Sequence, residues 1–298
     1  MTTTDRNVSA TNISTRNIST PPPAAPPGVT LTNGLDALRR SAAATGELLA
    51  AMSDNQDIVP VPGLAWTVSE TAAHLVTLLT SSAAYASGAR DGAAERAALP
   101  PGGAAERMAL GNARELERLV ERRIPVLRQL LASAVDEYST AITGRRASGP
   151  VETPFGQEDP AVMTAALVGE QLVHGFDLAR AVGQRWSIDP DAARLALTGT
   201  APLLPYLVNA DAIRDISARI EFRIVGAPRF TLVLDHGRAA VEAANGHCDC
   251  WISAQPVPYL LLAYNRIGRW RPLLRREVRS GGRRRGLAMR LPRYLSVS

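Results

Sequence analysis

The chain has 298 residues, 46% of them hydrophobic and 20% charged, so it can bury a substantial core, and its length favours two domains over one. No run of 18 or more apolar residues occurs, and the N-terminus lacks the apolar stretch of a secretory signal. These features argue against a membrane-spanning protein, and we expect a cytoplasmic location with no membrane partner.

The formal net charge of +5 is unevenly distributed. Residues 266–298 contain eleven arginines and one acid, Glu277, whereas the rest of the chain is net acidic. Such a segment can meet phosphate, anionic lipid or a carboxylate substrate, or it can be a solvated, partly helical tail. Because neither interleaved aromatic residues nor a known binding motif accompanies the charge, we predict no nucleic-acid partner.

The two cysteines, Cys248 and Cys250, are too close in sequence for an ordinary disulfide. A Cys-x-Cys pair can bind metal or react, but it is also typical of small buried strand residues. The spacing argues against a secreted, disulfide-stabilised scaffold.

Residues 1–28 are dominated by Thr, Ser, Asn, Pro and Ala, so we predict a disordered N-terminal extension. Helical spacing of apolar residues and capping signals follow, with a capping box at Thr67–Glu70 and a cap plus proline at Asp159 and Pro160. Loops are predicted at 90–103 and 144–158. The predicted helices cover residues 31–52, 68–86, 104–121, 123–143, 160–182 and 190–208.

After Ala210 the hydrophobic period changes to that of strands. Strands are predicted at 219–225, 230–234, 239–243 and 250–253, with a short helix at 257–264. We therefore predict an α+β fold, in which a helical bundle over 29–209 precedes a small α+β domain over 210–298 with an arginine-rich tail.

Glu170 and His174 lie four residues apart in the helix predicted for 160–182, so their side chains share one face, one turn apart. His74, inside another predicted helix, is the candidate third ligand, because bundles build metal sites from side chains on facing helices. Two histidines and a glutamate can hold a catalytic zinc that keeps one position open. The same residues can also be a chance helical pair and a hydrogen-bonded core histidine.

Two segments carry longer motifs, Trp66-Thr-Val-Ser-Glu-Thr-Ala-Ala-His74-Leu and Glu170-Gln-Leu-Val-His174-Gly-Phe-Asp177-Leu-Ala-Arg180. Both resemble the mycothiol-dependent maleylpyruvate isomerase family, an actinobacterial branch of the DinB-like metal-binding helical bundles. Residues 249–256 and 260–269 resemble the family's C-terminal domain, which is related in shape to sterol carrier proteins. The resemblance implies a DinB-like four-helix bundle with a sterol-carrier-like C-terminal domain, and zinc ligands at His74, Glu170 and His174. Phe176 and Asn265 depart from the family's usual Trp and Gly.

The resemblance also implies mycothiol as the thiol cosubstrate. Its thiolate would add to the double bond of maleylpyruvate, the resulting single bond would rotate, and expulsion of sulfur would leave fumarylpyruvate. Arg180, Arg266 and Arg269 are candidate catalytic cations for the carboxylates and the enolate. Asp177 can orient a metal ligand without binding the metal itself, or it can pair with Arg180, and we favour the pairing.

Two other functions stay open. A mycothiol S-transferase would use the same site to conjugate the thiol to other electrophiles, since fold does not fix function. A non-catalytic binding protein would hold a small molecule in its C-terminal domain and keep a structural metal in the bundle. We expect a monomer whose partners are mycothiol and a small electrophile or maleylpyruvate-like acid.

Overall fold

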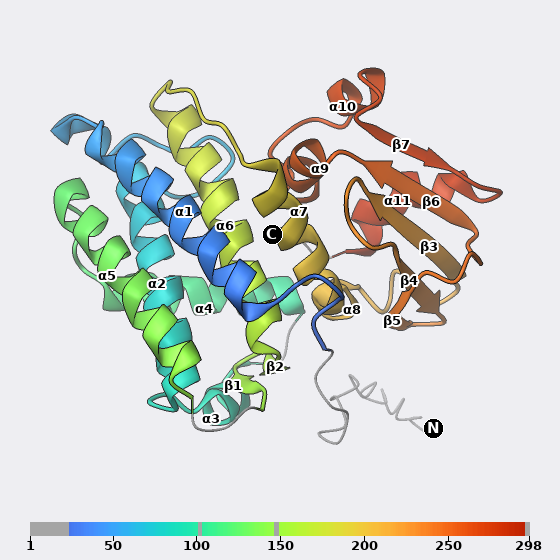
Figure 1. Cartoon of the computed structure of the whole chain (residues 1–298), viewed down its shortest axis with the longest axis horizontal. Coiled ribbons are helices and arrows are strands. Elements are labelled where there is room, and N and C mark those ends of the chain that lie inside the picture. Colours follow the sequence, from blue (N-terminus) through green and yellow to red (C-terminus); the bar gives the residue numbers. More distant parts are fainter. Residues whose placement is uncertain (1–23, 101–102, 146–148, 296–298) are drawn as a thin grey trace, which may run out of the picture.

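The computed structural model describes residues 24–100, 103–145 and 149–295. It has an α+β fold, which confirms the predicted class: a helical bundle lies beside a five-stranded sheet, as Figure 1 shows. The predicted disordered extension over 1–28 lies almost entirely outside the described residues. At the end of this segment, the Gly28 carbonyl accepts a hydrogen bond from Asn33 Nδ2 at 2.7 Å.

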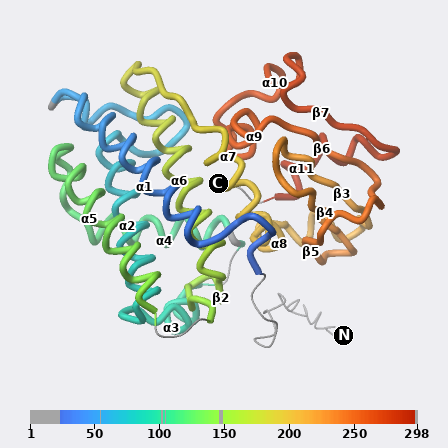
Figure 2. The backbone as a smooth tube through the Cα atoms, in the orientation of Figure 1, coloured from blue at the N-terminus to red at the C-terminus, as the bar shows by residue number. Residues whose placement is uncertain are grey.

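Four long helices form the bundle. They are α1 (Leu31–Ala50), α2 (Val68–Ser87), α5 (Ile124–Thr143) and α6 (Pro160–Ala181). α1 and α2 each pack against both α5 and α6, so the four helices enclose one core, and the tube in Figure 2 shows α1 running beside α6. Leu38, Leu75, Leu127 and Leu178 are fully buried in that core. A fifth helix, α4 (Ala104–Arg118), lies against α2.

Three short features depart from the prediction. The loop predicted at 90–103 contains α3 (Gly92–Ala97), and the turn-rich segment at 144–158 contains a hairpin of β1 (Val151–Thr153) and β2 (Gly156–Glu158). The single helix predicted from Pro190 ends at Gly199 as α7 (Pro190–Gly199). Pro202 lacks an amide hydrogen and its ring clashes with the carbonyl four residues earlier, so the α-helix cannot continue through it. The chain continues as η2 (Ala201–Leu203) and α8 (Leu204–Leu207).

The sheet has the strand order β5-β4-β3-β6-β7. Neighbouring strands are antiparallel except β3 and β6, which run parallel. Every second residue of β3 from Ala218 to Ile224 is buried, and α11 (Arg285–Tyr294) packs against β6 and β7. The strands are β3 (Ser217–Ile224), β4 (Phe230–Asp235), β5 (Arg238–Ala243), β6 (Cys250–Ala254) and β7 (Val278–Gly281). β7 was not predicted, and Cys250 is a buried strand residue.

The helix α9 (Pro256–Ala263) connects the two cores. Its residues Leu260 and Leu261 belong to the buried core of the bundle, whereas Tyr259 and Leu262 pack against the core of the sheet. The end of α9 is therefore held by both parts of the fold. The arginine-rich segment that follows contains α10 (Trp270–Leu274) and α11. The domain boundary at 209/210 stays a prediction.

None of the helices within the described residues combines the length and apolar character needed to cross a bilayer.

Candidate metal site

The middle of α6 carries two of the three predicted ligands. The helix begins at Pro160, where Asp159 caps it by accepting the Ala161 amide at 2.7 Å. From there the helical period places Glu170 and His174 on one face. His174 Nε2 lies 3.2 Å from Glu170 Oε2.

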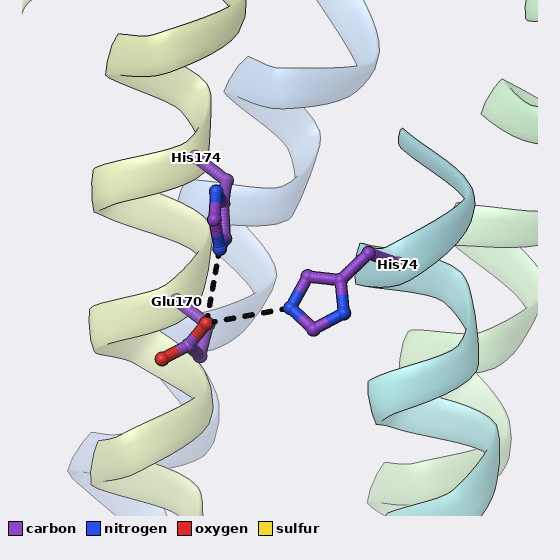
Figure 3. A group of neighbouring side chains, drawn as sticks. All are labelled: His74, Glu170 and His174. Carbon is purple, nitrogen blue, oxygen red and sulfur yellow. Dashed lines mark ion pairs between the residues drawn. The ribbon is translucent and has the colours of Figure 1, made fainter. Parts of the chain in front are cut away.

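The third side chain comes from α2. A capping box between Thr67 and Glu70 fixes the start of this helix, so His74 lies about two turns in and faces α6. Its Nε2 lies 3.6 Å from the same oxygen, Glu170 Oε2. Figure 3 shows the three side chains meeting between the two helices, and one ligand atom from each lies within 4.8 Å of the others.

The donor set and the two distances to Glu170 fit zinc. Zinc binds histidine nitrogen and carboxylate oxygen at about 2.1 Å, so two tetrahedral ligands lie about 3.4 Å apart. The two contacts to Glu170 Oε2, at 3.2 and 3.6 Å, are on either side of that value. Among the described residues, no fourth His, Cys, Asp or Glu joins the group. Three protein ligands with one open position are typical of a catalytic zinc rather than a structural one.

The electrostatics differ among the three side chains of the site. Burial, reinforced by His174, lowers the pKa of His74, so its imidazole is neutral at physiological pH. Burial also disfavours a charge on His174, but the carboxylates of Asp177 and Glu170 outweigh it and raise the pKa of His174. For Glu170, burial favours the neutral acid, yet the two histidines hold the pKa well below its usual range. The site thus holds an ionised carboxylate beside a neutral imidazole.

Asp177 connects His174 to the segment that follows α9. Its side chain is fully buried, and it accepts hydrogen bonds from Arg266 Nε at 2.9 Å to Oδ2 and 3.1 Å to Oδ1. Oδ2 also lies 3.3 Å from His174 Nδ1, within ion-pair distance. Arg180 Nη2 is 3.6 Å from Oδ1. The favoured pairing with Arg180 is therefore present, but Arg266 is the closer partner.

A pocket of about 260 Å³ lies next to this network. Arg180 and Arg266 both line it, and its other lining residues are Pro62, Gly63, Leu64 and Asn265. Arg180 is held across it, since its guanidinium donates to the carbonyls of Pro62 and Arg266. Arg269 is not among the lining residues, and its guanidinium carbon lies 5.2 Å from the centroid of the Trp270 ring. The structure thus brings two of the three predicted cations to one pocket.

One tryptophan ring lies beside the two histidines, and another packs on the same helix, α6. The centroid of the Trp66 ring lies 4.7 Å from that of His74 and 6.2 Å from that of His174. Trp186 packs so tightly over α6 that a Cβ on Gly175 would be 2.2 Å from its Cζ2 atom. The sequence analysis included Trp66 in a motif but predicted no role for Trp66 or Trp186. The position of Trp66, directly before the residue that caps α2, was the one feature of the sequence that could have pointed to it.

Residues 38–179 match the family model described as the mycothiol maleylpyruvate isomerase N-terminal domain. No curated protein matches the chain in sequence.

Among solved structures, the mycothiol-dependent maleylpyruvate isomerase is similar at 15% identity, covering 85% of this chain and 93% of the other, with a TM-score of 0.49. A histidine-to-alanine mutant of that isomerase gives 14% identity, the same coverages and the same TM-score. The sec-alkylsulfatase of Pseudomonas sp. shares 12% identity over 58% of this chain and 25% of its own, with a TM-score of 0.30. Likenesses this distant do not bear on activity.

Proposed function

The helical part of this chain belongs to the mycothiol maleylpyruvate isomerase N-terminal domain family, and on that premise we propose that the protein is a zinc-dependent enzyme with mycothiol as its thiol cosubstrate. The proposed reaction is the cis–trans isomerisation of maleylpyruvate or a similar acid. One observation carries the proposal: His74, Glu170 and His174 converge on one point between two packed helices.

Those three side chains would hold the metal. Zinc, when bound, would favour the thiolate form of a coordinating thiol, which is the nucleophilic form. The neutral His74 imidazole is ready to ligate, whereas the raised pKa of His174 means that it gives up a proton on binding. Asp177 accepts from Arg266 and lies against the outer nitrogen of His174, so it orients that ring.

In the proposed reaction, the thiolate forms a bond to one alkene carbon and the electron pair of the double bond moves onto the conjugated carbonyl as an enolate. The former double bond rotates, the enolate reforms it in the trans geometry, and the thiolate leaves unchanged. Two negative carboxylates and the enolate need cations. Arg180 and Arg266 are the candidates, because both line the pocket beside Asp177.

The test is a thiol-dependent isomerase assay. The zinc-loaded full chain is incubated with maleylpyruvate, with and without mycothiol, and fumarylpyruvate is quantified by chromatography. We expect product only with mycothiol, and none from a His174→Ala variant whose helix content is intact. Equal product from wild type and variant would contradict the proposal.

The same assay separates the other functions considered. A stable adduct of mycothiol with the acid or with other electrophiles, without isomerisation, identifies an S-transferase. Zinc binding without thiol turnover of any electrophile identifies a non-catalytic binding protein.

A further inference from the structure

The segment 264–266 follows α9 and reaches back to α6. Because α9 packs into the bundle through Leu260 and Leu261 and onto the sheet core through Tyr259, its C-terminal end has a fixed position. The segment begins at Tyr264, the cap residue of α9, whose amide donates to Leu260 at 3.1 Å.

A left-handed turn at Asn265 sets the direction of the segment. Asn265 has φ +57°, a conformation that asparagine tolerates better than most residues. The next amide, Arg266 N, returns to the Leu261 carbonyl at 2.7 Å and closes the helix end. The turn lets both neighbours of Asn265 contact the bundle: Arg266 meets Asp177, and Tyr264 packs against the bundle core.

The hydroxyl of Tyr264 lies against the residue that precedes a proposed ligand. A Cβ on Gly169 would be 3.1 Å from the Tyr264 hydroxyl oxygen, closer than an ordinary van der Waals contact. The missing side chain at Gly169 therefore makes room for the phenol beside Glu170. The Glu170 carboxylate directs Oε2 at both histidines, which leaves Oε1 for another partner.

The phenol is a donor at this place. A phenol has an ordinary pKa of about 10, so it is protonated at physiological pH. The Tyr264 hydroxyl also interacts electrostatically with the Glu170 carboxylate. A protonated phenol beside an ionised carboxylate donates a charge-assisted hydrogen bond.

We infer that Tyr264 is a positioning residue for Glu170: its hydroxyl, seated against Gly169, donates to the carboxylate and holds it with Oε2 towards His74 and His174. The inference rests on the proposed function, because it treats Glu170 as a metal ligand. Through Tyr264 and Arg266, one three-residue segment of the C-terminal part would orient both ligands of α6, Glu170 directly and His174 through Asp177.

The first test is the zinc affinity of Tyr264→Phe in the full chain, measured by competition with a chromogenic chelator. Loss of a group that orients a ligand weakens metal binding about 10- to 100-fold, and we expect that range. Tyr259→Phe is the matched control, because Tyr259 is also a partly buried tyrosine and lies on α9 but packs against the sheet core. It should bind zinc as the wild type does.

Gly169→Ala perturbs the same contact from the other side. Its methyl group would push the hydroxyl away, so this variant should also weaken zinc binding. If both changes act through one hydrogen bond, the double variant should bind no more weakly than Tyr264→Phe alone. Far-UV circular dichroism of each metal-free variant verifies that the bundle is intact.

Each outcome has a distinct meaning. Wild-type affinity in Tyr264→Phe would overturn the inference while leaving zinc and the proposed function untouched. Additive losses in the double variant would also overturn it, because the two residues would then act separately. Absence of zinc binding in the wild type would instead refute the proposed function on which the inference rests.

Discussion

Replacing Asp177 by asparagine tests the network that connects the site to the C-terminal segment. The carboxylate is fully buried and is the counterion of Arg266, whose side chain is only 9% exposed. Removing one partner of a buried ion pair costs roughly 3–5 kcal/mol, because the remaining charge loses its compensation. Asparagine keeps the volume and one acceptor oxygen, so we expect the metal-free protein to lose about 3 kcal/mol of unfolding free energy.

The measurement is urea unfolding with a chelator present, followed by circular dichroism, so that zinc plays no part in it. Replacing both partners of such a pair by apolar or neutral groups destabilises a protein less than replacing one partner. Asp177→Asn combined with Arg266→Met should therefore recover part of the loss. Asp211→Asn is the control, because Asp211 pairs with Arg214 on the exposed surface and should cost less than about 1 kcal/mol. A loss of unfolding free energy in Asp177→Asn no larger than the loss in this control would refute the reasoning.

Two further predictions concern packing and pH. Gly175→Ala should lower the free energy of unfolding by roughly 1–3 kcal/mol, because its methyl group would overlap Trp186. Gly111→Ala, on α4 with open space around it, should instead raise the free energy of unfolding by up to about 1 kcal/mol. Thermal unfolding compares the two variants, and equal effects would contradict the close packing at Gly175. Zinc affinity should fall as the pH is lowered, because the raised pKa of His174 keeps a proton on that ring that the metal has to displace. Chelator competition at several pH values measures this, and a flat profile would contradict it.

Long elements and their caps were predictable because local chemistry determines them. The capping box at Thr67 and the cap at Asp159 are both present, and each starts a helix that carries proposed ligands. α3 and the β1–β2 hairpin were missed because their stability comes from each other: Arg96 donates to the Thr153 carbonyl at 2.9 Å and pairs with Glu152. Segments this short contain too few residues to show the hydrophobic periodicity that predicts a helix or a strand.

The candidate site also has a part that the sequence predicts and a part that it does not. The i, i+4 spacing of Glu170 and His174 follows from helix geometry, and the pairing with His74 required only that two helices face each other. Tyr264 had no comparable signal. Its approach to Gly169 depends on how α9 packs on the bundle and on a left-handed turn at Asn265, neither of which a local pattern specifies.

The measurement that tests the central claim most directly is the zinc content of the purified wild type beside that of His74→Ala, with His236→Asn as an exposed-histidine control. We predict about one zinc ion per chain in the wild type and the control, and none in His74→Ala with its helix content unchanged. Equal zinc in all three, or no zinc in the wild type after zinc has been supplied, would contradict the assignment of His74, Glu170 and His174 as a metal site.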